Sequence, residues 1–339
     1  MIPDVCFYFH STRLHFTQLI TGLELLHQKG KINLQYSLEN ISYPIDLCRV
    51  KYKDKILIFD MADSTEIQES IYEECDFYIK RMLLKEDYNK KEKLVPYGLN
   101  YSVFYENRYL QNLIYKKNFF KYSVRYHPTL SRILNMKNSI GSSHLKKLQA
   151  SPKEDFGIVF RSRLWNPENN PTDWKKEERK KMNRDRIEIN KILKEQYGDL
   201  FSSGIEKDEF SEKECPELLI PDKEYHKANY LKKLKNVSVG IITEGLEKSI
   251  GWKLGEYVAH SMAILTSPID EFQLPGDFRE GANYLVFKSQ QELLKKIRQL
   301  YNDSDLRMEI QQNNQEYYNE YLEPAAKLQK IFIRINEKA

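Results

Sequence analysis

Cysteine is scarce in this chain of 339 residues, and its distribution argues against a zinc site or a disulfide framework. The four cysteines, Cys6, Cys48, Cys75 and Cys215, stand far apart, and no two of them form a CxxC pair. Cysteine-ligated zinc sites show such pairs, and small secreted disulfide scaffolds are much denser in cysteine. We therefore expect reduced thiols in a cytoplasmic protein, and no metal.

Glycine and proline are also few, with 13 and 12 residues, which excludes collagen-like and low-complexity chains. No apolar run approaches the roughly 20 residues that a membrane-spanning helix requires. The N-terminus lacks a basic segment followed by a long apolar one, so we expect no secretory signal. A soluble protein, or at most one bound at a membrane surface, is expected.

A strong excess of charge of one sign is missing as well. Lysine and arginine total 53 and aspartate and glutamate total 49, a net charge of +4, which does not favour a dedicated nucleic-acid binder. Hydrophobic residues make up 41% and charged residues 30%, a globular balance. The length is more than twice the roughly 150 residues of one domain, which predicts two domains.

The N-terminal half reads as alternating strands and helices. A strand at Val5–Phe9 is followed by apolar residues at helical spacing up to Gly30, and further strands are expected at Lys55–Asp60, Cys75–Arg81 and Lys93–Asn100. A linker-like stretch near residues 138–152 ends this half. We therefore place the N-terminal domain at residues 1–145 and the C-terminal domain at residues 146–339.

The C-terminal half repeats the α/β pattern. Helices are expected at about 174–197 and 223–234, and from Gln290 through Lys338 with a break at Pro324. The expected strands are Asp155–Phe160, Asp199–Ile205, Val237–Thr243, Ala263–Pro268 and Asn283–Phe287.

The segment from Val237 to Phe287 carries the strongest functional signal. A buried strand ends at Thr243, a polar loop containing Glu244 follows, and a helix begins near Ser249 and Gly251. This order places unpaired backbone N–H groups and a positive helix end at the carboxyl edge of a strand, where a diphosphate can bind.

Two charged residues of that helix extend the interpretation. Lys253 could add positive charge beside the diphosphate, and Glu256, one turn later, could accept hydrogen bonds from ribose hydroxyls. The alternative is an ordinary βαβ unit whose Lys–Glu pair is merely solvated.

The same segment resembles the donor-binding half of GT-B glycosyltransferases, specifically of bacterial enzymes that build cell-surface polysaccharides. The matching parts are Lys253–Glu256, the small-residue turn Ala259–Ser261, the strand Ala263–Thr266 and the loop Pro268–Asp270. The resemblance covers about the last hundred residues, and the N-terminal half only by architecture. It implies two Rossmann-like domains facing a central cleft, with the acceptor side in the first domain and the nucleotide sugar in the second.

One departure from the family leaves the stereochemistry open. Many retaining members carry two glutamates eight positions apart, but the residue eight positions before Glu256 is Lys248, with Glu244 and Glu247 as nearby substitutes. The resemblance also makes Arg161 and Arg163, which follow the strand at 155–160, candidates for holding the donor phosphates. Arginine suits this role because its planar fork binds phosphate oxygens in pairs; the alternative is a salt bridge at a strand end.

A glycosyl transfer also needs a base for the acceptor hydroxyl. His10, Asp60 and Asp63 follow strands of the first half, where a general base at the cleft is suitably placed. A single histidine can equally be structural. Two basic stretches complete the list: Lys116–Arg125 could touch an anionic membrane that carries a lipid-linked acceptor or be a solvated helix face, and Lys175–Arg186 is expected to be solvated.

The function expected from the sequence is that of a glycosyltransferase that moves a sugar from a nucleotide-sugar donor to a glycan or lipid-linked acceptor. We expect it in the cytoplasm, either free or at the inner face of the cell membrane, with no cofactor beyond the donor substrate and no nucleic-acid partner. The alternative is a non-catalytic glycan- or nucleotide-binding protein with the same fold.

Overall fold

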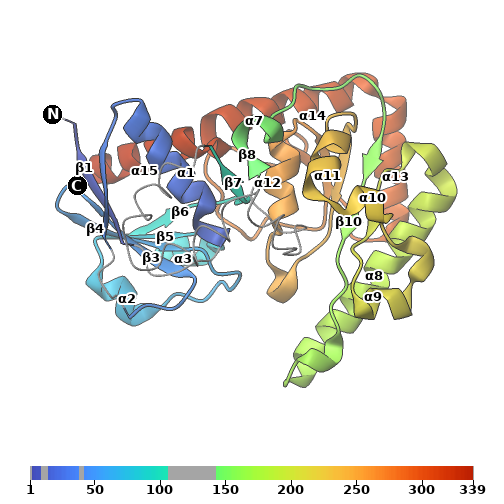
Figure 1. The fold of residues 1–339 in the computed structure, drawn as a ribbon, viewed down its shortest axis with the longest axis horizontal. Coiled ribbons are helices and arrows are strands. Elements are labelled where there is room, and N and C mark those ends of the chain that lie inside the picture. The colour runs from blue at the N-terminus through green and yellow to red at the C-terminus, as the bar shows by residue number, and fades with distance from the viewer. Residues whose placement is uncertain (1, 9–13, 38–41, 106–142, 339) are drawn as a thin grey trace. The chain divides into compact units, whose positions relative to one another are not determined.

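The computed structural model describes residues 2–8, 14–37, 42–105 and 143–338. The chain forms two compact units, which are shown together in Figure 1. Unit 1 consists of Met1–Leu148, Asp270–Phe278 and Tyr317–Ala339, and unit 2 of Gln149–Ile269 and Arg279–Glu316. The change of unit after Leu148 lies close to the boundary expected at residue 145. The two later segments of unit 1 differ from the expectation, which assigned everything after residue 145 to the second domain.

Unit 1 contains a six-stranded sheet in the order β2-β1-β3-β4-β5-β6. The pairs β1–β2, β4–β5 and β5–β6 are parallel, whereas β3 runs antiparallel to both of its neighbours. The strands are β1 (Asp4–Tyr8), β2 (Asn33–Ser37), β3 (Leu47–Tyr52), β4 (Lys55–Asp60), β5 (Phe77–Lys80) and β6 (Leu94–Pro96). The mixed sheet departs from an all-parallel Rossmann pattern because only two residues join β3 to β4, and so short a connection can only link antiparallel strands.

Two helices far apart in sequence form the main helical layer of unit 1. Helix α1 (Thr17–Gln28) buries ten of its residues, and α15 (Pro324–Lys338) packs directly against it (Figure 1). The apolar face of α15, including Leu328, Ile331 and Ile335, is buried. This burial explains why the C-terminal segment belongs to unit 1. The shorter elements of the unit are α2 (Glu69–Glu74), α3 (Lys85–Lys90), β7 (Val103–Phe104), β8 (Ser143–His144), α7 (Leu145–Leu148) and the π-helical turn Tyr318–Leu322.

Unit 2 is built on a four-stranded parallel sheet in the order β14-β13-β12-β9. A short parallel pair, β10–β11, continues it, and bridges from Ile158 to Phe201 and from Ile205 to Leu219 extend the same side. The strands are β9 (Ile158–Val159), β10 (Arg161–Ser162), β11 (Gly204–Ile205), β12 (Val239–Ile242), β13 (Ala263–Thr266) and β14 (Tyr284–Val286). The α/β fold class with parallel strands is thereby confirmed.

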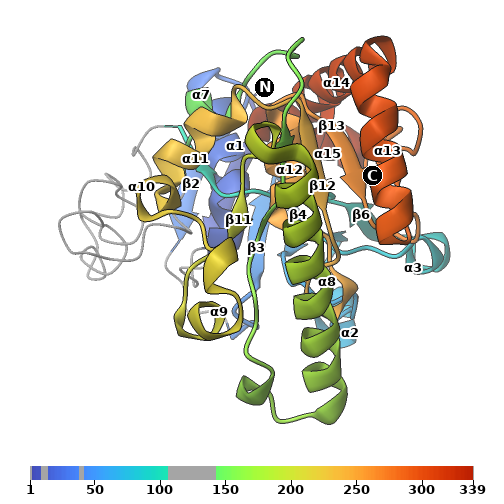
Figure 2. The same ribbon diagram turned by 90° about the vertical axis from the view of Figure 1, so that its right-hand side faces the viewer.

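Helices cover both faces of this sheet. Ile189 and Leu193 of α8 (Asp173–Tyr197) and Leu293 and Ile297 of α13 (Gln290–Asn302) share one apolar core with the strands (Figure 2). Helix α12 (Trp252–Ala259) lies so close to β12 that a Cβ atom on Gly240 would meet the ring of Tyr257 at 2.4 Å. The remaining helices are α9 (Glu209–Glu214), α10 (Asp222–Tyr225), α11 (Lys227–Leu234) and α14 (Ser304–Tyr317).

The strand order creates a topological switch point between β9 and β12. From β9 the chain continues toward β10 and β11, and from β12 it continues toward β13 and β14, on the opposite side. In open α/β sheets, ligands bind in the crevice at the carboxyl ends of the strands at such a point. The segments that flank it are residues 161–172 and the loop at residues 243–251, hereafter the donor loop.

Candidate functional site

Three side chains predicted to bind phosphate interact with the largely buried carboxylate of Glu206, beside the switch point. Arg161 Nε lies 3.1 Å from Glu206 Oε1, and Lys253 Nζ lies 3.5 Å from the same oxygen. Burial alone would raise the pKa of Glu206, but Lys253, Arg161 and Arg163 lower it below its ordinary value. The structure therefore brings Arg161, Arg163 and Lys253 together around a negative charge that the sequence did not reveal.

Two of the three cations also lie over aromatic rings. The Arg161 guanidinium lies 4.7 Å from the centre of the Tyr230 ring, and that of Arg163 lies 4.6 Å from the centre of the Trp165 ring. Burial lowers the pKa of Lys253, while the charge of Glu206 acts in the opposite direction. Lys253 lies in the first turn of α12, whose N-cap, Gly251, offers no side-chain hydrogen bond.

Glu256 is buried and already has a charged partner. Its carboxylate forms an ion pair with Lys227 of α11. Burial would raise the pKa of Glu256, but the charge and hydrogen bond of Lys227 bring it below the ordinary value. The carboxylate expected to meet a ribose is thus ionised. It lies on the same side of α12 as the cluster around Glu206, because residues three apart, such as Lys253 and Glu256, are neighbours on a helix surface.

Arg186 of α8 forms hydrogen bonds with both segments that flank the switch point. Its guanidinium donates from Nη1 to the carbonyl of Arg163 at 2.6 Å, from Nη2 to the carbonyl of Glu244 at 2.8 Å, and from Nε to Thr243 Oγ1 at 3.3 Å. Burial lowers its pKa to about 10. The expectation that Lys175–Arg186 is solvated is wrong at Arg179, Asn183 and Arg186, which are all buried.

The donor loop is closed by its own backbone. The Gly245 N–H donates to the carbonyl of Ser249 at 2.8 Å, and the Ser249 N–H donates to the carbonyl of Leu246 at 3.0 Å. The Ser249 side chain is buried, whereas a Cβ atom at Gly251 would meet nothing within 4 Å. Of the predicted donor residues, Ser249 therefore shapes the loop, and Gly251 leaves the start of α12 open.

A cavity of about 410 Å³ lies at the carboxyl ends of β12, β13 and β14. Thr243 and Glu244 line it together with side chains of α8 and the start of α13. The structure therefore divides the predicted donor residues between two neighbouring places, this cavity and the cluster around Glu206. The lining residues of the cavity also include Glu178, Lys181, Met182, Asp185, Ile189, Ser267, Pro268, Phe287, Lys288 and Gln290.

The candidate bases of unit 1 differ in their surroundings. Asp60 is 1% exposed, and its Oδ2 accepts hydrogen bonds from Tyr78 Oη at 2.7 Å and from Lys80 Nζ at 2.8 Å. These contacts give Asp60 a structural part and do not favour it as a base. Asp63 forms an ion pair with Arg81, and 47% of its side chain is exposed. His10 and the basic stretch Lys116–Arg125 lie outside the described residues.

The described part of the chain contains neither a membrane-spanning helix nor a metal-binding cluster. None of the described helices combines the length and apolar character that crossing a membrane requires. Within the same ranges, no group of three or more His, Cys, Asp or Glu side chains is arranged to hold a metal ion.

Three residues of the site, Glu206, Arg186 and Lys227, were missed by the sequence analysis. Each contacts a predicted residue from a distant part of the chain: Glu206 contacts Arg161, Arg186 contacts Glu244, and Lys227 contacts Glu256. Of the three, only Arg186 could have been found from the sequence, because it lies one helical turn before Ile189 and Asn190, which belong to the buried face of α8.

No protein-family profile matches the chain, and no curated protein is similar to it in sequence. Solved structures are similar at low identity. They include the C-terminal domain of a glycosyl transferase group 1 family protein (LpcC) from Francisella tularensis, with 14% identity, a TM-score of 0.37, and coverage of 52% of this chain and 97% of that one.

Two further solved structures span most of this chain. WaaG, a glycosyltransferase involved in lipopolysaccharide biosynthesis, has 14% identity, a TM-score of 0.41, and coverage of 91% of this chain and 80% of that one. Anabaena Alr3699/HepE in complex with UDP-glucose has 10% identity, a TM-score of 0.43, and coverage of 99% and 100%. Of these three structures, the LpcC domain and WaaG are described as those of glycosyltransferases.

Proposed function

We propose that this protein is a nucleotide-sugar-dependent glycosyltransferase that serves bacterial cell-surface polysaccharide synthesis. The observation that carries the proposal is the convergence of Arg161, Arg163 and Lys253 on Glu206 at the switch point of unit 2. With Lys227 and Glu256, the group contains four positive and two negative charges. This excess of positive charge suits a diphosphate, which carries roughly three negative charges at neutral pH.

The proposed chemistry follows from these charges. A donor diphosphate would lie against Arg161, Arg163 and Lys253, and the positive end of α12 would add to their field. These groups would neutralise the charge that develops on the leaving nucleoside diphosphate as the glycosidic bond to it breaks. A ribose hydroxyl would meet Glu256 in place of, or beside, Lys227.

The acceptor side of the proposal rests on unit 1. A glycan or lipid-linked acceptor must lose the proton of its attacking hydroxyl, and His10 and Asp63 are our candidates for the base. The proposal places this acceptor at the cytoplasmic face of a membrane. That location and any membrane contact of Lys116–Arg125 are part of the proposal.

The test is turnover. The purified protein is incubated with UDP-, GDP-, ADP-, CDP- and dTDP-sugars and candidate glycan acceptors, and release of the nucleoside diphosphate is measured. Acceptor-dependent release from one donor supports the proposal. Tight nucleotide binding without release from any donor–acceptor pair would favour the alternative, a non-catalytic nucleotide- or glycan-binding protein.

A further inference from the structure

The donor loop contains two consecutive residues in an unfavourable backbone conformation. Glu247 has a φ of 56° and Lys248 a φ of 60°. L-amino acids with a side chain rarely adopt this left-handed region, because the Cβ atom crowds the following carbonyl group. Such a conformation persists only where surrounding contacts hold it.

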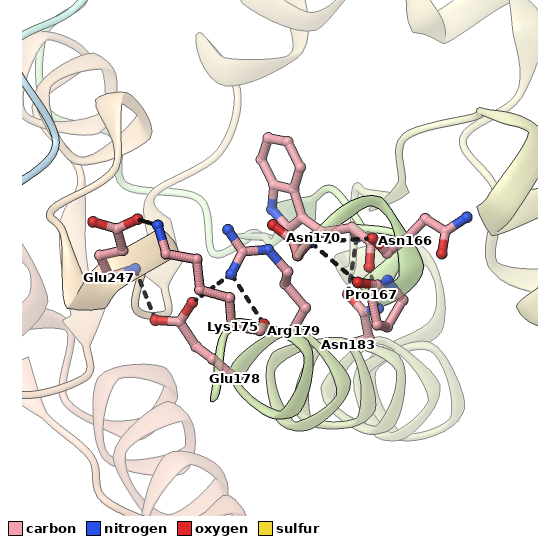
Figure 3. A network of polar contacts seen from close by, with 9 residues as sticks. Asn166, Pro167, Asn170, Lys175, Glu178, Arg179, Asn183 and Glu247 are labelled. Atoms are coloured by element: carbon pink, nitrogen blue, oxygen red, sulfur yellow. Dashed lines mark hydrogen bonds and ion pairs between the residues drawn. The ribbon is translucent and has the colours of Figure 1, made fainter. Parts of the chain in front are cut away.

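Two side chains from the first turns of α8 supply these contacts. Glu178 Oε1 accepts a hydrogen bond from the backbone N–H of Glu247 at 2.7 Å, and Lys175 Nζ lies 2.6 Å from Glu247 Oε1. Figure 3 shows Lys175 and Glu178 pointing from the helix toward Glu247 on the loop. Residues of α8 therefore bind both the backbone N–H and the side chain of Glu247 in the loop.

Other residues of α8 hold Lys175 and Glu178 in position. Arg179, which is buried, donates from Nη1 to Glu178 Oε2 at 3.0 Å and to the carbonyl of Lys175 at 3.0 Å. Each oxygen of Glu178 thus has its own partner. Asn183, two turns from Lys175, bonds the backbone N–H and carbonyl of Trp165 at 3.0 and 2.8 Å (Figure 3).

The contacts of α8 therefore reach both segments that flank the switch point. Asn183 anchors the helix to the segment that carries Arg163, and Lys175 and Glu178 reach from the helix to the donor loop. The loop leads directly into Gly251 and the first turn of α12, which carries Lys253. Its conformation determines where the N–H groups of that turn point.

We propose that Glu178 and Lys175 are positioning residues that hold the donor loop in its left-handed conformation and so preorganise the start of α12 for a diphosphate. The proposal rests on the function proposed above. Neither residue needs to touch the ligand, so their loss weakens binding of the outer phosphate more than binding of the nucleoside part.

The experiment compares Glu178→Ala and Glu178→Gln with the wild type and with Glu177→Ala. Glu177 is the adjacent residue of α8, has an exposed carboxylate paired with Lys180, and serves as the matched control. Calorimetry gives the affinities for the best-binding nucleoside diphosphate among UDP, GDP, ADP and CDP and for its monophosphate. Hydrogen exchange of peptides covering residues 243–251 reports the loop conformation without ligand.

Glu178→Ala should bind the diphosphate about tenfold more weakly than the wild type does. Its affinity for the monophosphate should change by less than about threefold, and hydrogen exchange in the loop should be faster. Glutamine keeps one oxygen acceptor for the Glu247 N–H but turns an amide N–H group toward Arg179, so the affinity of Glu178→Gln should lie between those of Glu178→Ala and the wild type. Glu177→Ala should stay within about threefold of the wild type. Adding Lys248→Gly to Glu178→Ala should recover part of the loss, since glycine adopts a positive φ without strain.

The failures of the two proposals are distinguishable. If the wild type binds a diphosphate and Glu178→Ala binds it equally well, or the variant loop exchanges at the wild-type rate, the positioning role is overturned and the proposed function stands. If the wild type binds none of these four diphosphates and no dTDP, the proposed function fails, and this inference fails with it.

Discussion

At the residue scale, the buried imidazole of His260 makes the stability of the folded protein depend on pH. His260 is fully buried, and its Nδ1 lies 2.8 Å from the carbonyl oxygen of Glu256. Burial, aided by the charges of Lys153 and Lys227 and opposed by Glu256, lowers the pKa of His260 to about 4. The folded protein therefore keeps this ring neutral at pH values where the unfolded chain, with an ordinary pKa near ~6.5, binds a proton.

The sign of the pH dependence follows from this difference. Between about pH 6.5 and pH 4, the unfolded state binds more protons at His260, so this residue makes stability fall as the pH falls, by up to about 3 kcal/mol. Urea denaturation measured from pH 7 to pH 4 should show a shallower decline for His260→Gln than for the wild type. Parallel curves would show that folding does not lower the pKa of His260.

A second prediction at this scale concerns Glu256. In Glu256→Ala, Lys227 keeps its charge in a largely buried place without its partner, which should cost about 3 kcal/mol of stability. Loss of a charged hydrogen-bond acceptor should also weaken nucleotide binding about 10- to 100-fold. Calorimetry measures the affinity. The control is Glu224→Ala, which removes a glutamate of α10 that forms an ion pair with Lys233 of α11. Unchanged affinity in Glu256→Ala would remove Glu256 from the donor site.

At the scale of elements, the packing of α1 against α15 depends on one glycine. A Cβ atom at Gly22 would lie 2.3 Å from the backbone oxygen of Pro324. Because the obstacle is backbone, Gly22→Ala must separate the helices, and we expect a loss of about 1–3 kcal/mol. Chemical denaturation measures it. Gly251→Ala, where the new Cβ meets nothing within 4 Å, should change stability by less than about 0.5 kcal/mol; equal effects would contradict the packing argument.

Elements were predictable where the signal is local. The apolar spacing that ends at Gly30 predicted the helix found at Thr17–Gln28, and Pro324 begins α15 as the expected break requires. The strand β3 (Leu47–Tyr52) was missed, although Arg49 and Lys51 alternate with its apolar residues as is typical of a half-buried strand. The expected strand Asp199–Ile205 is reduced to Gly204–Ile205 after a short 3₁₀ turn.

At the scale of the whole molecule, the sequence predicted the two α/β units but not which segments each contains. The return of Tyr317–Ala339 to unit 1 depends on contacts with α1, about 300 positions earlier. The candidate site shows the same limit. The sequence motif led to Arg161, Lys253 and Glu256, whereas their partners Glu206 and Lys227 come from segments with no motif of their own.

The most direct test of the central claim compares a nucleoside diphosphate with its nucleoside. If Arg161, Arg163 and Lys253 form a diphosphate site at the switch point, calorimetry on the wild type should show the diphosphate of the preferred base binding at least about 100-fold more tightly than the nucleoside. Lys253→Met should lose most of that difference. Equal affinity for diphosphate and nucleoside in the wild type would contradict the account.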